Sequence, residues 1–69
     1  MDNMHKVKIT VRDRVFFAWQ RSMESVRLFE GFIKEMEDGS DAKTLFEHIS
    51  EREAVNSAEL LSLLRKYEN

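Results

Sequence analysis

The stretch from residue 13 to residue 37 constrains the fold of this chain more than any other feature. It contains no proline, and it holds four of the five phenylalanines and the single tryptophan. A helix with this much apolar surface cannot cover it alone, and short isolated helices are marginal in water. The stretch must therefore pack against the rest of the chain, against a second copy or against another protein.

The length of 69 residues allows one domain near the lower limit of what a single hydrophobic core can stabilise. There is no cysteine, and the two histidines, His5 and His48, lie too far apart for a zinc cluster. We therefore expect no disulfide, no metal site and no cofactor. The apolar fraction of 42% is that of an ordered domain, so oligomerisation or a partner protein is the expected source of extra stability.

No segment approaches eighteen consecutive apolar residues, and the amino terminus lacks an apolar block. We therefore expect no contact with a membrane and a cytoplasmic location. Charge is unevenly divided, since residues 1–34 carry seven basic and four acidic side chains, whereas residues 35–69 carry four basic and nine acidic ones. The basic end could face a polyanion, which the acidic end would repel.

Residues 6–12 alternate polar and β-branched side chains, which is typical of a strand. A lone strand is not stable in a monomer, and no other segment has this pattern. We therefore predict an extended basic arm over residues 1–12, either loosely docked or paired with the arm of a second copy.

Asp13 is a plausible cap for the predicted first helix. From there, the residues that form one face of the helix are spaced alternately four and three positions apart. The members of this face are Val15, Trp19, Ser22, Val26, Phe29, Ile33 and Met36. Phe17 and Leu28 lie on the opposite side together with Arg21. An amphipathic helix that packs through one face only would not carry this second apolar stripe. Whether Ser22–Ser25 splits the segment into two helices stays open.

The second half of the chain predicts two shorter helices. Gly39 marks a break within residues 37–41, and a polar stretch at 50–53 precedes Asn56, which resembles a helix cap with Glu59 three positions on. We therefore predict an all-α, three-helix domain over residues 13–69, in which helices 41–50 and 56–67 form a hairpin packed on the long first helix. The predicted core is Val15, Trp19, Val26, Phe29, Ile33, Leu45, Phe46, Ile49, Val55, Leu61 and Leu64.

Catalysis finds no support in the sequence, because the carboxylates lie on helix surfaces and neither histidine has a nucleophile nearby. Residues 45–64 have the spacing of a degenerate EF-hand, but Arg52 would occupy a calcium-ligand position. A helix-turn-helix in the same region would present acidic residues to phosphates. We expect a chain that is not an enzyme.

The basic arm followed by helices resembles the ribbon-helix-helix proteins, a family that includes many small antitoxins, over about thirty residues. In that family, strands from two subunits pair and enter the major groove. The resemblance implies that Lys6, Lys8 and Thr10 face DNA and that Val7, Ile9 and Val11 face the dimer core. The glycine-bearing turn of the family has no counterpart here, because only Ser22–Ser25 could serve.

These patterns predict a small regulatory or adaptor protein of bacterial or phage character. It would act as a homodimer that binds another protein through an aromatic helix surface, with Phe17, Trp19, Leu28 and Arg21 as the partner-binding residues. The alternative is a DNA-binding regulator or antitoxin that uses Lys6, Lys8, Thr10 and Arg12. Salt separates the two, because DNA binding weakens steeply with salt.

Overall fold

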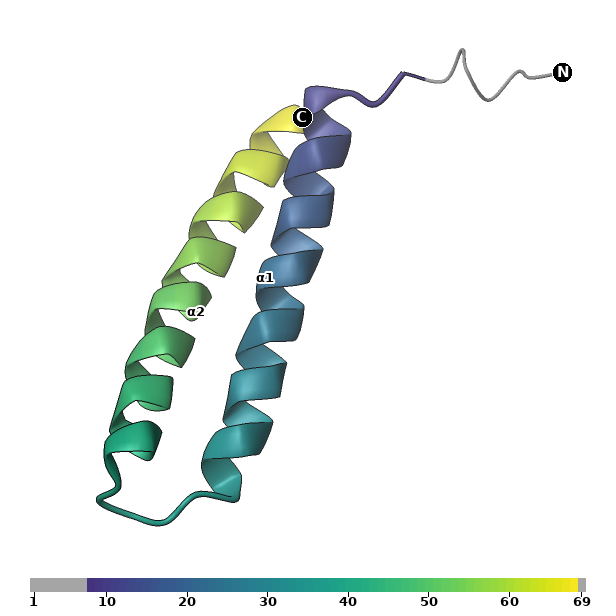
Figure 1. Cartoon of the computed structure of the whole chain (residues 1–69). Coiled ribbons are helices and arrows are strands. Elements are labelled where there is room, and N and C mark those ends of the chain that lie inside the picture. Colours follow the sequence, from purple (N-terminus) through teal and green to yellow (C-terminus); the bar gives the residue numbers. More distant parts are fainter. Residues whose placement is uncertain (1–7, 69) are drawn as a thin grey trace, which may run out of the picture.

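The computed structural model describes residues 8–68, which form a helical hairpin (Figure 1). Helix α1 (Val11–Lys34, 24 residues) and helix α2 (Asp41–Tyr67, 27 residues) lie side by side and run in opposite directions. The start of α1 and the end of α2 therefore lie at one end of the hairpin, and the connecting loop lies at the other. The all-α prediction is confirmed for this part of the chain, which contains no strand.

Helix α1 begins at Val11 because Thr10 caps it. The Thr10 hydroxyl accepts a hydrogen bond from the Asp13 backbone N–H at 3.0 Å, and the Asp13 carboxylate accepts one from the Thr10 N–H at 3.1 Å. This reciprocal capping box satisfies two of the free N–H groups at the helix start. The prediction of Asp13 as the cap was wrong by one turn, since Asp13 is the partner of the cap. Residues 8–10 form no strand, and residues 1–7 lie outside the described part.

Helix α1 runs without a break through Ser22–Ser25, which settles the question left open by the sequence. Serine can weaken a helix by offering its hydroxyl to the local backbone. Here the Ser22 hydroxyl instead donates across the hairpin to the Glu53 carbonyl, at 3.1 Å. The tertiary contact removes the competition that would have favoured a turn.

Helix α2 is one helix where two were predicted, so the described residues contain two helices and the three-helix prediction was wrong. The polar residues that suggested a turn satisfy their hydrogen bonds within a helix. Asn56 Nδ2 donates to the Glu53 carboxylate at 2.9 Å, and Ser57 Oγ donates to Ser22 Oγ at 2.8 Å. No proline or glycine follows Gly39, so nothing in the backbone forces a break.

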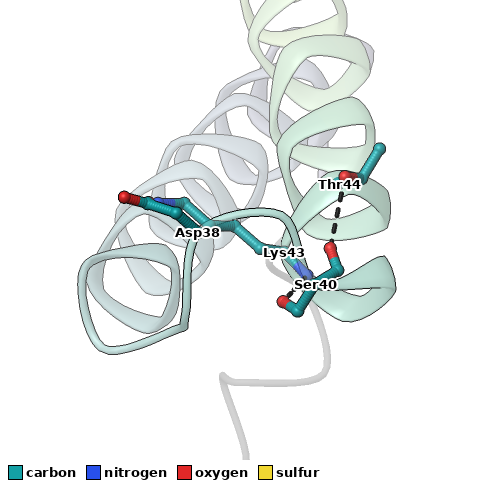
Figure 2. A network of polar contacts seen from close by, with 4 residues as sticks. All are labelled: Asp38, Ser40, Lys43 and Thr44. Carbon is teal, nitrogen blue, oxygen red and sulfur yellow. Dashed lines mark hydrogen bonds and ion pairs between the residues drawn. The ribbon is translucent and has the colours of Figure 1, made fainter.

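The connection between the helices coincides with the predicted break. Gly39 has φ of +80°, a left-handed conformation that favours glycine. Ser40 caps α2, because its hydroxyl accepts from the Lys43 N–H at 3.1 Å. The Thr44 hydroxyl donates to the Ser40 carbonyl at 3.2 Å, and the Lys43 ammonium pairs with the Asp38 carboxylate, as Figure 2 shows. These contacts fix the direction in which the chain enters α2.

The two helices meet along a seam that follows alternating steps of three and four residues, the spacing of a two-stranded coiled coil. On the α1 side the buried and half-buried seam positions are Val15, Trp19, Ser22, Val26, Phe29, Ile33 and, just past the helix, Met36. On the α2 side they are Lys43, Phe46, Ser50, Glu53, Ser57, Leu60 and Leu64. The α1 face is the one that the sequence predicted.

The core of the hairpin is thin. Among the described residues, the large apolar side chains counted as buried are Val15, 8% exposed, and Leu64, 4% exposed. Other predicted core residues are half-buried, namely Trp19, Val26, Phe29, Ile33, Phe46, Ile49 and Leu61. Leu45 and Val55 were wrongly placed in the core, since they are 53% and 58% exposed. They lie away from α1 because α2 continues as one helix past both of them.

Candidate protein-binding surfaces

The middle of the seam is polar. Ser22 and Ser57 are 5% and 4% exposed, and their hydroxyls form a chain in which Ser57 donates to Ser22, and Ser22 donates to the Glu53 carbonyl. Ser50 is also buried. Polar residues at seam positions fix the alignment of two helices at some cost in stability. This cluster therefore sets the register of the hairpin more than it strengthens it.

Aromatic side chains gather in the first half of α1. The Phe16 ring lies 5.9 Å from the Phe17 ring and 6.1 Å from the Trp19 ring, measured between centroids. Phe17 is 57% exposed, whereas Phe16 and Trp19 are half-buried. We call Phe16, Phe17, Trp19, Met23 and Leu61 the aromatic patch.

The aromatic patch borders an open groove between the two helices. The groove has a volume of about 240 Å³ and is lined by Trp19, Met23, Ala54, Ser57, Ala58 and Leu61. A smaller hollow of about 170 Å³ beside it is lined by Trp19, Gln20, Met23, Glu24 and Arg27. An apolar groove next to polar side chains is the usual anatomy of a protein-binding surface.

The opposite flank of the hairpin carries a larger groove of about 510 Å³. Its lining residues are Ala18, Arg21, Ser22, Glu53, Asn56, Glu59, Leu60 and Leu63. Arg21 stands on the α1 wall and Glu59 on the α2 wall. The groove thus combines apolar side chains with one cation from α1, Arg21, and two anions from α2, Glu59 and the seam residue Glu53.

Of the four residues predicted to bind a partner, Phe17 and Trp19 belong to the aromatic patch, whereas Arg21 and Leu28 lie outside it. Trp19 lies in the seam, whereas Phe17, Arg21 and Leu28 lie on the outer side of α1. Leu28 is 54% exposed. The patch neighbours Phe16, Met23 and Leu61 were absent from the predicted site, although the positions of Phe16 and Met23 beside the predicted seam face could have indicated them.

The residues of the DNA-binding alternative are used differently in the described part. Thr10 caps α1, and the Arg12 guanidinium pairs with the Glu68 carboxylate at 2.8 Å, which joins the start of α1 to the end of α2. Lys8 is exposed, and Lys6 lies outside the described residues. Helix α1 is continuous where a ribbon-helix-helix arrangement would need a turn.

Two carboxylates outside these surfaces have lowered pKa values. The hydrogen bond from the Thr10 backbone N–H is the main cause that lowers the pKa of Asp13, and the Thr10 hydroxyl contact adds to it. The hydrogen bond from Lys43 lowers the pKa of Asp38, and the same bond raises the pKa of Lys43. Both carboxylates make hydrogen bonds at the start of a helix, so we attribute these pKa shifts to structural contacts.

Neither described helix is long and apolar enough to cross a membrane. Residues 8–68 contain no group of three or more histidine, cysteine, aspartate or glutamate side chains that could hold a metal ion. No protein-family model, curated protein or solved structure matches the chain. The argument for function therefore depends on the surfaces described above.

Proposed function

We propose that this chain is a small, non-enzymatic regulatory or adaptor protein that binds another protein through the aromatic patch. The observation that carries the proposal is the exposed Phe17 ring, which is 57% exposed and is backed by Phe16 at 5.9 Å. An exposed ring held against one neighbouring ring loses little freedom on binding. Aromatic residues and methionine are enriched at the centres of protein interfaces.

The surroundings of the patch support a protein partner. The groove beside Trp19 is lined by apolar side chains apart from Ser57, whose hydroxyl already donates to Ser22. A side chain of a partner could therefore enter without leaving a buried polar group unpaired. The charged and amide groups of Gln20, Glu24 and Arg27 lie alongside and supply a polar rim.

Capture of partners from a lysate of the native host tests the proposal. Phe17→Ala should abolish capture of a specific protein and leave helix content and melting temperature nearly unchanged, because the ring is mostly exposed. Val55→Ala is the matched control, since Val55 is 58% exposed on the outer side of α2. Leu28→Ala measures how far the binding surface extends along α1.

Capture should persist at high salt, because an aromatic contact does not depend on long-range charge. Equal capture by wild type and the Phe17 variant would contradict the proposal. Binding to duplex DNA that weakens steeply with salt and is unaffected by Phe17→Ala would favour the DNA-binding alternative, which uses the basic end of the chain.

A further inference from the structure

On one flank of the hairpin, the row of positions directly beside the seam holds no charged residue. Its positions, one step outside the seam on each helix, are Val11, Ala18, Ser25 and Phe32 on α1 and Ala42, Ile49, Asn56 and Leu63 on α2. We call these eight residues the uncharged flank. At the equivalent positions the other flank carries charges, Glu30, Glu47 and Glu68, between the apolar residues Phe16, Met23, Ala54 and Leu61.

This asymmetry distinguishes a two-stranded coiled coil from a larger bundle. In a two-stranded coiled coil, both flanking positions usually carry charges that face solvent. In a bundle, each helix has a third apolar position on one flank, because it packs against two neighbours. Both α1 and α2 have the bundle pattern, and in both helices the third position lies on the same side of the hairpin.

Six of the eight residues of the uncharged flank are exposed in the hairpin alone, and Ser25 and Ile49 are half-buried. Val11 is 56% exposed, Phe32 44% and Leu63 39%. Leu28 and Leu45, which border the flank, are 54% and 53% exposed. The groove of about 510 Å³ lies between the helices on this flank, with Ala18, Asn56 and Leu63 among its lining residues. Such a stripe on a soluble domain marks an interaction surface.

We propose that a second copy of this chain covers the uncharged flank, so that two hairpins form a four-helix bundle. This goes beyond the proposed function, because the surface for self-association is separate from the aromatic patch. In the bundle, each α1 lies beside the α2 of the partner hairpin as well as its own.

The length and area of the flank fit a second hairpin. Val11 and Phe32 are separated by about 32 Å along α1, at about 1.5 Å per residue, and two helices are together about 20 Å wide. The footprint is therefore roughly 640 Å², close to the ~800 Å² per partner of a standard stable interface. A single short peptide would leave half of this stripe exposed, whereas a hairpin of equal length covers it.

The charges at the edge of the groove are suited to self-association. A two-fold interface must be complementary to itself. Arg21 on α1 and Glu59 on α2 stand at the same level on facing edges. In a bundle with its two-fold axis along the helices, Arg21 of one copy lies near Glu59 of the other, twice per dimer. One level towards the chain ends, Arg14 and Lys66 face each other, and their long side chains can turn to solvent.

Sedimentation of the full chain and three variants tests the proposal. The wild type should be a dimer at micromolar concentration. Ala18→Glu and Leu63→Glu each place a charge on the flank, so they should weaken dimerisation at least tenfold. Val55→Glu, a charge at an equally exposed position on the outer side of α2, should leave the dimer unchanged.

Charge reversal at the groove edge provides a test in which folding is not at risk, because Arg21 and Glu59 are both exposed. Arg21→Glu and Glu59→Arg should each weaken the homodimer about tenfold, since each creates two like-charged contacts. A mixture of the two variants should form a heterodimer as stable as the wild-type dimer, because both contacts then have opposite charges. If these residues met only within one hairpin, mixing would restore nothing.

A wild-type chain that is folded and monomeric at high micromolar concentration would overturn the proposal and would leave the flank to a different protein. If Leu63→Glu and both charge-reversal variants still form dimers as stable as the wild type, the proposal would also be overturned, because self-association would then use a different surface. Because Phe17→Ala should not affect sedimentation, failure of self-association and failure of the aromatic patch are distinguishable.

Discussion

The serine chain in the seam predicts a strongly non-additive mutational response. Ser57→Ala removes the 2.8 Å bond to Ser22 but leaves Ser22 donating to the Glu53 carbonyl. Ser22→Ala removes both of these hydrogen bonds, but the Ser57 hydroxyl can then turn to the same carbonyl, which lies four residues before it on its own helix. Each single variant therefore loses about one net hydrogen bond.

The expected cost of each single variant is about 1 kcal/mol, the usual net contribution of a hydrogen bond to stability. The double variant should cost no more than about 1 kcal/mol, because no buried hydroxyl remains to be satisfied and methyl groups suit the seam. Simple addition would give about 2 kcal/mol, so the coupling between the two sites should be at least about 1 kcal/mol. For a domain of this size, 1 kcal/mol corresponds to a shift in melting temperature of about 4–8 °C.

Chemical denaturation followed by circular dichroism measures these free energies, at one fixed protein concentration because self-association would raise stability. Ser62→Ala corrects for the higher helix propensity of alanine, because Ser62 is exposed on the same helix. Single-variant costs that add within about 0.5 kcal/mol in the double variant would refute the coupling. The hydroxyl chain would then make no cooperative contribution to the seam.

Three further outcomes follow from the contacts. Phe29→Ala should cost about 2–3 kcal/mol, because its ring meets Phe46 edge-on at 5.2 Å but is half-buried, whereas Leu45→Gln should change the unfolding free energy by less than about 0.5 kcal/mol. Acid should weaken the start of α1. Because the pKa of Asp13 is lowered, its stabilisation is present above the ordinary carboxyl pKa of 3.8 and is lost as pH falls below it. Asp13→Asn should therefore lose less stability than wild type on acidification. Arg12→Ala should cost at most about 1 kcal/mol and show no difference from wild type at high salt, because its pair with Glu68 is exposed.

The α1 side of the seam was predictable because its apolar residues repeat in steps of four and three, with Ser22 as the one gap. The α2 side was not, since four of its seven seam positions are polar: Lys43, Ser50, Glu53 and Ser57. Without the partner helix, a polar stretch at 50–53 followed by Asn56 has the composition of a turn and a cap. Within the helix, the Ser57 hydroxyl donates its hydrogen bond to Ser22, which lies 35 residues away in the sequence.

The exposed residues were easier to predict than their grouping. Phe17 and Leu28 were expected off the first-helix core face, and they are 57% and 54% exposed. Val55 was placed in the core by its apolar character alone. When a helix is taken to end at residue 50, the sequence does not show which side of α2 faces α1 beyond that point. Once α2 is continuous, its phase is fixed by Phe46 and Leu64, which places Val55 on the outer side.

At several positions the hairpin departs from the distribution of polar and apolar residues that an independent hairpin would require. Three serines and the charged Lys43 and Glu53 occupy positions in the seam, while Val11 and Phe17 are more than half exposed and Leu63 is 39% exposed. A lone hairpin would gain stability from exchanging these positions, since each buried apolar side chain contributes roughly 1.5–3 kcal/mol. The arrangement makes sense if the seam specifies how the two helices align and the outer surfaces supply the apolar burial by association. The stability of the chain should then rise with self-association through the uncharged flank.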